Sequence, residues 1–330
     1  NGLLYTPYFP LKTSISDVRF NADNNRVALD NITVKSGGSD ISARGEVTNI
    51  RPAMMGRAPL KLNLKVTSEK IDANELLTAY SAGMNYRPET AAAGDASTEN
   101  ISEFIAQAET TVSEVADTAL SLIVIPANIE ANISLEANDI DYSDLCIDWM
   151  ASDIVMRNRC LQVTNTVATS NMGDIYFEGF YSTRSKDDIK TGFDLNLADI
   201  TADKVVQLFP VVDTIMPMLT SFKGHLDCEM AATTDLDTNM VILTPTMNGV
   251  IKIKGRDVSV EDSPEFRKLA RTLMFKDKKI GKVADMSVSG IVSDNRLEIF
   301  PFVLKVDRYT MAMSGLQDFD QSFRYHVSVL

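Results

Sequence analysis

The chain has 330 residues, 45% of them hydrophobic, so it is long enough for two or three domain-sized units with ordinary buried cores. Its formal net charge of -13 argues against a general nucleic-acid binder, because neutralising phosphates requires a surplus of Lys and Arg on the contact surface. The composition therefore excludes disorder of the whole chain and disfavours nucleic acid as a partner.

The cysteines and the hydropathy of the chain further narrow the possible classes of protein. Cys146, Cys160 and Cys228 cannot all pair within the chain, and none lies in a CxxC pair or a Cys/His cluster. We expect no disulfide framework, metal or other cofactor, although Cys146 and Cys160 could bridge neighbouring strands. No window reaches the roughly 20 apolar residues that cross a bilayer. Because the chain begins at Asn1 rather than Met, we expect an excerpt whose targeting signal lies upstream.

The first predicted element is a hairpin that starts at Val27 and ends at Gly45. Apolar and polar residues alternate along both of its strands, which is the period of a half-buried β-strand, and Gly37-Gly38-Ser39 supplies the turn. A further strand follows at Leu60 to Val66. We assign residues 1-86 to this first β repeat and its short helix.

That short helix is predicted to start within residues 71-77, with Asp72 as its N-cap. Residues 87-122 then form a linker rich in Ala, Ser, Thr and Gly, followed by apolar residues at helical spacing over 101-120. Ile123 to Pro126 is expected to resume the sheet.

The second β repeat with its helix is assigned to residues 123-225. Its hairpin starts at Leu161, turns at Asn171-Met172-Gly173 and ends at Gly179, and a further strand follows at Phe193 to Leu197. An apolar stripe over residues 202-222 predicts a helix that its two prolines bend or split.

The third β repeat is assigned to residues 226-330. It contains an alternating strand at Gly249 to Lys254, a capped helix over 264-275, and then only strands from Met286 to the chain end. Its hairpin starts at Leu297 and ends at Gly315.

The three hairpins align without a gap at displacements of 134 and 136 residues, and each ends in a glycine eighteen residues after its apolar start. Such self-similarity outweighs single-residue clues about the fold. The predicted class is α+β and mostly β, with repeated antiparallel meanders that form an extended curved sheet and a few amphipathic helices packed on it or at its ends.

Two stretches carry a resemblance to a known family. Residues 198-203 leading into Val205 to Phe222, and the tail containing residues 255-260, 266-273 and 313-320, resemble the C-terminal region of the AsmA family in order and spacing. The similarity covers about residues 123-330. The first repeat is connected to it only through the internal repetition.

The resemblance implies a non-enzymatic protein of the Gram-negative cell envelope. Members of this group have a β-rich body in the periplasm and an N-terminal inner-membrane helix, which would lie in a segment absent from this chain. They are associated with outer-membrane assembly and with carrying phospholipid between membranes. Because the family has no catalytic motif, it implies no catalytic residue. This chain departs from the long groove-forming members in having only about three repeats.

A carrier of phospholipid or another envelope lipid must offer a dry surface to the acyl chains, and a sheet with one unbroken apolar face does so. Its groove would be lined by Leu161, Val163, Ile175, Phe177, Leu195, Leu197, Leu297, Ile299, Met311 and Met313. The competing interpretation is that these side chains form a closed core beneath the helices over 202-222 and 264-275.

Two other kinds of site were weighed. A basic cluster could attract anionic head groups, although a solvated helix face is the favoured interpretation: Arg267, Lys268, Arg271, Lys278, Lys279 and Lys282. Neither His225 nor His326 has a matching nucleophile, and Asp139, Asp141 and Asp144 lack the spacing of a calcium loop. An alternative function is a scaffold that docks envelope proteins through sheet edges, with residues 17-20 as a candidate edge.

Overall fold

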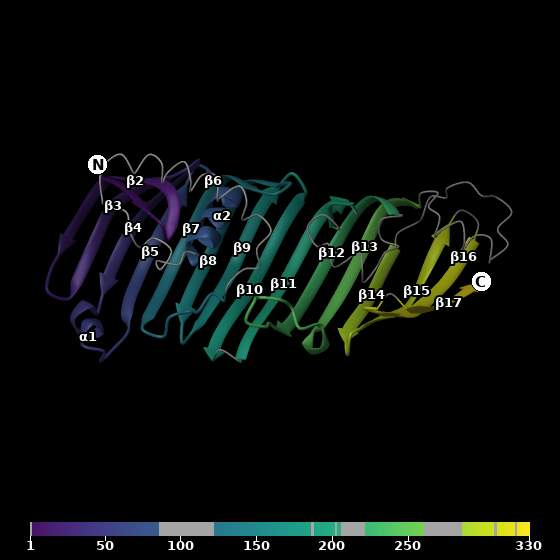
Figure 1. The fold of residues 1–330 in the computed structure, drawn as a ribbon. Coiled ribbons are helices and arrows are strands. Elements are labelled where there is room, and N and C mark those ends of the chain that lie inside the picture. The colour runs from purple at the N-terminus through teal and green to yellow at the C-terminus, as the bar shows by residue number, and fades with distance from the viewer. Residues whose placement is uncertain are drawn as a thin grey trace, which may run out of the picture. The chain divides into compact units, whose positions relative to one another are not determined.

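The computed structural model describes residues 2-85, 122-185, 188-201, 203-205, 222-260, 286-306, 309-320 and 322-330. Within this part of the chain, seventeen strands are assigned to one β-sheet, accompanied by two short α-helices and a 3-10 turn (Figure 1). The prediction of a mostly β fold built from antiparallel meanders is therefore confirmed.

The chain forms two compact units. Unit 1 comprises Asn1–Thr164, Tyr181–Ile189 and Leu236–Val241, and unit 2 comprises Asn165–Phe180, Lys190–Asp235 and Ile242–Leu330. The elements that lie wholly in unit 1 are β1 (Gly2–Thr6), β2 (Phe9–Ala22), β3 (Arg26–Ser36), β4 (Ser39–Thr48), α1 (Ile50–Met54), β5 (Leu60–Ser68), β6 (Ile71–Asp72), α2 (Ala73–Asn85), β7 (Ile129–Tyr142) and β8 (Leu145–Arg157).

The remaining elements belong to unit 2 or are divided between the units. Strands β9 (Cys160–Ser170), β10 (Gly173–Ser185) and β11 (Asp188–Thr201) contribute residues to both. Unit 2 alone holds β12 (Phe222–Asp235), η4 (Thr244–Thr246), β13 (Asn248–Val260), β14 (Met286–Ser293), β15 (Arg296–Val306), β16 (Tyr309–Asp318) and β17 (Phe323–Val329).

One strand pairing breaks the meander. Strand β5 pairs with β7 in parallel, with Leu60 opposite Ile129 and Ser68 opposite Ala137. Parallel neighbours need a crossover connection, and here β6, α2 and the segment up to β7 supply it. Each repeat is a meander as predicted, but the join between the first and second repeats is a crossover that the sequence pattern did not reveal.

The repeated glycines have a common structural setting in two of the hairpins. Gly45 lies opposite Leu29 between β3 and β4, and Gly315 lies opposite Ile299 between β15 and β16. In both hairpins the register shifts immediately afterwards, between Leu29 and Ile32 and between Ile299 and Phe302. The sequence repeat therefore encodes a hairpin with a β-bulge at a fixed place.

Gly45 cannot be replaced without distortion. Its φ is +145°, and a Cβ there would lie 2.0 Å from the backbone oxygen of Asn63 on β5. A Cβ on Gly315 would lie 2.1 Å from the ring of Tyr325 on β17. Close approach of the next strand thus explains why glycines occupy these positions within β4 and β16.

The turns and the first helix largely follow the predictions. Gly37 and Gly38 form the turn between β3 and β4, and the Asp72 side chain accepts the backbone N–H of Glu75 at 2.9 Å, as an N-cap of α2 should. Ile123 to Pro126 is not a strand, because β7 begins only at Ile129. Instead, its backbone is hydrogen-bonded by the side chains of Tyr181 and Thr183.

Several predicted elements lie outside the described residues. These are most of the 87-122 linker with the 101-120 helix, the 264-275 helix, and residues 202 and 206-221 of the 202-222 helix. Residues 203-205 of that predicted helix are helical, but Phe222, its predicted last residue, begins β12.

Candidate functional site

The two faces of the unit 1 sheet differ sharply in chemistry. Along β5, the side chains at even positions from Leu60 to Val66 are apolar, and those between them are polar. Parallel pairing places Leu62 opposite Ala131 and Leu64 opposite Ile133, so β7 continues the same apolar face. The strand period of two therefore produces one apolar side and one polar side.

The polar side is internally paired. Lys61 and Glu130 form an ion pair at 3.6 Å, and the Asn132 side-chain amide donates to the Asn63 side-chain oxygen at 2.9 Å. The Ser134 hydroxyl donates to the Asp153 carboxylate on β8 at 2.9 Å. These contacts determine which face of the sheet is exposed to solvent, and they oppose a one-residue shift in strand register.

On the apolar side, residues that pair across neighbouring strands form continuous rows. One row crosses β3, β4, β5, β7 and β8, and the next row crosses the same strands one pair closer to α1. The first row consists of Leu29, Gly45, Leu64, Ile133 and Ile154, and the second of Val27, Val47, Leu62, Ala131 and Met156.

Most large side chains in these two rows are only half-buried. Leu62, Leu64 and Ile133 are neither covered nor fully exposed, whereas the small Ala131 is buried between its larger neighbours. An apolar sheet face in a folded domain normally packs against another layer. A face of this size that stays half-exposed is characteristic of a binding surface.

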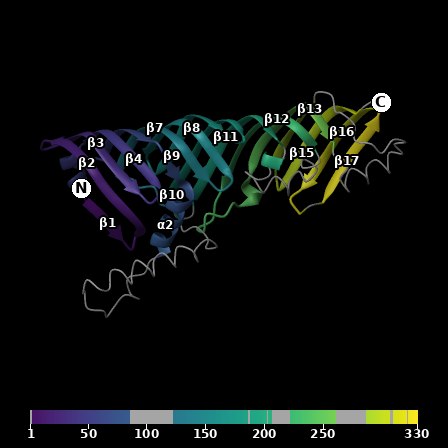
Figure 2. The same cartoon turned by 90° about the horizontal axis from the view of Figure 1, so that it is seen from above.

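Helix α2 covers one end of this face. It packs against β2 and β7 and lies on one side of the unit 1 sheet (Figure 2). At this end of the strands the side chains on the apolar face become small and buried, including Ser36, Ser68 and Ala137. The half-exposed rows begin where α2 no longer covers the sheet.

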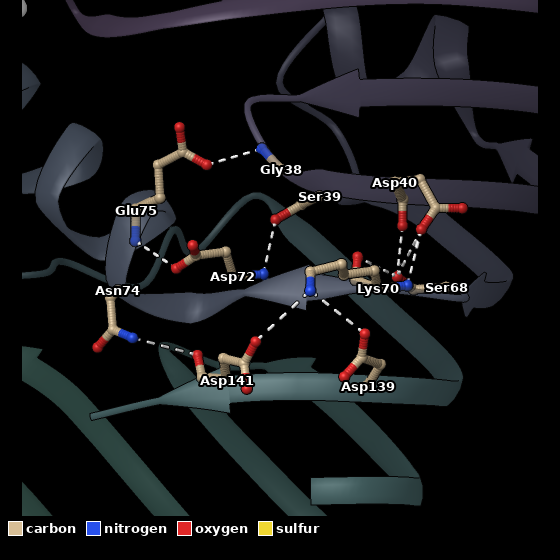
Figure 3. Close-up of polar contacts among 10 residues, drawn as sticks. All are labelled: Gly38, Ser39, Asp40, Ser68, Lys70, Asp72, Asn74, Glu75, Asp139 and Asp141. Carbon is tan, nitrogen blue, oxygen red and sulfur yellow. Dashed lines mark hydrogen bonds and ion pairs between the residues drawn. The ribbon is translucent and has the colours of Figure 1, made fainter. Parts of the chain in front are cut away.

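A polar network anchors the start of α2 to the strand ends (Figure 3). The Gly38 backbone N–H donates to the Glu75 carboxylate at 2.7 Å, and the Asp72 backbone N–H donates to the Ser39 hydroxyl at 2.9 Å. The Asn74 side-chain amide donates to the Asp141 backbone oxygen at 3.5 Å. Because these contacts join three separate strand ends, they hold α2 in a fixed place on the sheet.

The same network contains two of the three carboxylates that were candidates for calcium ligands. The Lys70 ammonium lies 3.3 Å from the Asp139 carboxylate and 3.7 Å from the Asp141 carboxylate (Figure 3). The hydrogen bond to Asp139 and the attraction of both carboxylates raise the pKa of Lys70. No cluster of potential metal ligands occurs among the described residues, and the Lys70 ammonium compensates one of the two negative charges of Asp139 and Asp141.

Unit 2 also has an apolar sheet face, but most of its large side chains are buried. A single row runs in register from β11 to β17, through Leu195, Met230, Ile251, Gly290, Ile299, Gly315 and Tyr325. Leu195 is 4% exposed and the neighbouring Leu197 1%. Burial of this kind is typical of a packed core.

The structure thus divides the ten predicted groove residues by burial. Leu161, Val163, Ile175 and Phe177 are half-buried, on β9 and β10. The other six, in unit 2, are buried: Leu195, Leu197, Leu297, Ile299, Met311 and Met313. Buried side chains offer little surface to a ligand, so for these six the packed-core interpretation is favoured.

Sequence reasoning recognised Leu60 to Val66 as a strand but did not place it in the groove. The signal that could have found it is the tripeptide Leu62-Asn63-Leu64, which is identical to Leu195-Asn196-Leu197. Of the other candidates, the six basic residues of the predicted head-group cluster, within 267-282, lie outside the described residues.

The cysteines are free thiols. Cys146 is exposed, Cys160 is half-buried and Cys228 is buried. Burial raises the pKa of Cys228 to about 12, so its thiol stays protonated and unreactive near neutral pH. A hydrogen bond to Asp141 raises the pKa of Cys146. The predicted possibility of a Cys146–Cys160 bridge is not realised in this structure.

No helix in the described part of the chain is both long and apolar enough to span a bilayer. Comparison of the chain with known protein families, with curated proteins and with solved structures gave no match in any of the three. The AsmA resemblance therefore stays a prediction, and the function must be argued from the geometry.

Proposed function

We propose that this protein is a non-enzymatic lipid-binding protein, and that the half-exposed apolar face of unit 1 holds the acyl chains of a phospholipid or a related envelope lipid. The observation that supports the proposal most strongly is the pair of in-register rows containing Leu62 and Leu64. Both rows are apolar across β3 to β8 and only half-buried.

The dimensions suit this ligand. From Leu60 to Val66 the face extends about 20 Å along a strand at 3.3-3.4 Å per residue, and β3 to β8 span about 19 Å at the usual strand spacing. An acyl chain in one leaflet occupies about half of the ~30 Å hydrocarbon core. Each square ångström of apolar surface withdrawn from water contributes about 25 cal/mol, which favours lying on this face over exposure to water.

The sheet backbone also suits an apolar ligand. Its N–H and C=O groups are used by the ladders between neighbouring strands, so side chains alone line the surface. The AsmA resemblance adds the setting: a periplasmic body, an inner-membrane anchor outside this chain, and a role in outer-membrane assembly.

The test is lipid binding by delipidated protein, measured by native mass spectrometry after incubation with phospholipid vesicles. Leu64→Asn combined with Ile133→Asn places two polar groups side by side in one row, and we expect it to weaken binding roughly tenfold or more. Lys65→Asn with Ser134→Asn is the matched control, since these residues form the neighbouring pair on the polar face.

Both double variants should keep the circular-dichroism spectrum of the native sheet, because all four positions are partly or fully exposed. The proposal is wrong if the wild-type protein binds no phospholipid at any concentration, or if the two double variants weaken binding equally.

A second candidate function is a scaffold that pairs with other envelope proteins through its sheet edges. Within the described residues, β1 is paired only with β2 and β17 only with β16, and exposed apolar side chains mark both strands, such as Leu3 and Phe323. The predicted edge at residues 17-20 extends beyond the pairing with β1, but the Asp17–Arg19 ion pair and a register shift disfavour strand addition there. Phe323→Lys should abolish partner capture if this function is correct, without affecting lipid binding.

A further inference from the structure

The segment between β4 and β5 lies at the end of the unit 1 sheet far from α2 (Figure 1). It exposes apolar side chains. Met54, the last residue of α1, is 84% exposed, and Met55 is 56% exposed. Both belong to the short segment 49-59 rather than to the apolar sheet face. Two adjacent exposed methionines are unfavourable in water, because removing their apolar surface from water is favourable.

The segment is held in shape by hydrogen bonds. Asn49 adopts a left-handed conformation, with φ of +62°, and its side-chain amide donates to the Pro59 oxygen at 3.4 Å. The Arg51 and Arg57 backbone N–H groups donate to the Asn25 side chain and to the Pro52 oxygen. The methionines are therefore presented from a defined turn.

Positive charge surrounds them. Arg51 and Arg57 are exposed on the segment itself, and Arg157 and Arg159 are exposed at the turn after β8. That turn lies at the same end of the sheet, because Leu60 pairs with Ile129 and Ala131 pairs with Met156. It is about 10 Å from β5, two strand spacings away.

None of these four arginines forms an ion pair within the described residues, whereas the nearby acidic side chains are already engaged. Glu46 pairs with Arg26, Glu130 pairs with Lys61, and the Asp23 carboxylate accepts two backbone N–H groups. The four arginines therefore concentrate positive charge around the methionines, in a chain whose net charge is -13.

We infer that segment 49-59 and the 157-159 turn form a docking surface for an anionic bilayer. Met54 and Met55 enter the boundary between head groups and acyl chains, and the four arginines bind lipid phosphates, which their planar guanidinium groups can contact bidentately. Each cation near an anionic membrane surface strengthens binding, and the apolar side chains add a contribution that salt does not screen.

This surface does not require an acyl chain on the sheet, so it can be tested apart from the proposed function. The half-exposed rows end at Leu60 and Ile129, beside the docking surface. A bilayer docked there would adjoin one end of the proposed lipid-binding face.

The test is co-flotation of the chain with phosphatidylcholine vesicles, with and without phosphatidylglycerol. We expect binding only to the anionic vesicles, and Arg51→Gln with Arg57→Gln should weaken it about thirtyfold, the effect of two cations near the surface. Met54→Ser with Met55→Ser should also weaken it, but that loss should persist at high salt, where the contribution of the arginines is screened.

Matched controls lie elsewhere on the surface. Arg44→Gln changes an exposed arginine on the polar face of β4, and Leu77→Ser changes an exposed apolar residue of α2 at the opposite end of the strands. Neither should alter flotation. Failure of the wild-type chain to bind anionic vesicles, or equal losses in the controls, would overturn the inference and leave a protein partner as the occupant.

Tryptophan fluorescence gives a second measure of membrane docking. Trp149 is the single tryptophan, so Trp149→Phe with Met54→Trp moves the indole to the docking segment. Its emission should shift to shorter wavelength with anionic vesicles, because the indole leaves water. An unchanged spectrum under conditions where the chain floats would show that another surface contacts the membrane.

Discussion

The tripeptide Leu-Asn-Leu occurs once in each unit, in two very different environments. In β5 of unit 1, Leu62 and Leu64 are half-buried, whereas in β11 of unit 2, Leu195 and Leu197 are 4% and 1% exposed. In both strands the leucines lie on the apolar face and the asparagine between them on the exposed face. Alternation thus determines which face is apolar, but not whether that face is covered.

Under the proposed function, the same repeat has separate tasks in the two units. In unit 2 the large apolar side chains of β11 to β16 are mostly buried and stabilise the fold. In unit 1 much of the apolar face, beyond the end that α2 covers, is half-buried and would hold the ligand.

The largest expected effect comes from truncating the third residue of each tripeptide. Leu197→Ala should lower the free energy of unfolding by about 2-5 kcal/mol, because it leaves a cavity in a packed core. Leu64→Ala should cost about 1 kcal/mol or less, since its side chain is already partly in water. Urea unfolding of both variants measures the difference, and equal losses would contradict the contrast between the units.

The repeated glycines test whether the two hairpins are equivalent. Gly45→Ala should destabilise the protein by about 2 kcal/mol or more, because its φ is +145° and its Cβ would meet a backbone oxygen. Gly315→Ala should cost less, since the nearest obstacle is the Tyr325 ring, which can rotate away. Thermal unfolding compares the two, and a larger loss at Gly315 would show that the strands approach differently.

Surface ion pairs in the two units should make opposite contributions to the pH dependence of protein stability. A hydrogen bond from Lys254 lowers the pKa of Glu229 in unit 2. The ionised carboxylate therefore stabilises the folded protein above the unfolded pKa of about 4.3, and this stabilisation is lost as pH falls through the folded pKa. The raised pKa of Lys70 in unit 1 gives stabilisation that is present below about pH 10.4 and is lost as pH rises through the folded value.

Glu229→Gln and Lys70→Gln test this by melting-temperature titration. Both effects should be small, because the pairs are solvent-exposed. The difference from wild type should vanish in acid for Glu229→Gln and in alkali for Lys70→Gln. The opposite trend in either variant would contradict the assigned partners.

The smallest expected effect is a difference in the rate at which the cysteine thiols are labelled. Cys228 should react only after unfolding, because it is buried and its pKa is raised to about 12. Cys146 should react in the native protein, and Asp141→Asn should accelerate the reaction, because it removes a negative charge that raises the pKa of the thiol. Rapid native labelling of Cys228, followed by mass spectrometry, would show that the unit 2 face opens.

Much of the fold could be predicted from the sequence. The alternation at Val27 to Gly45 and its repeats gave the strand pairs, the Gly37-Gly38 turn and the N-cap at Asp72, because these depend on neighbouring residues. The parallel pairing of β5 with β7 could not be predicted, since it joins residues separated by a long connection.

The sequence predicted the type of surface that forms the candidate site, but not which residues form it. The sequence indicated an apolar sheet face, but six of the ten proposed residues, including Leu297 and Met311, are buried. Whether an apolar strand face is covered depends on how distant segments pack, and strand periodicity contains no information about that packing. The repeated tripeptide could have placed Leu62 and Leu64 on the apolar face, but their partial exposure could be identified only from the structure.

The most direct test of the central claim is photo-crosslinking with a phospholipid that carries a photoactivatable group on its acyl chain, followed by peptide mapping. The account predicts labelled peptides from β3 to β8, around Leu64 and Ile133, and little labelling of the buried residues of β11 to β16 in unit 2. Labelling concentrated at Leu197, Leu297 or Met311, or no labelling of the unit 1 face, would contradict it.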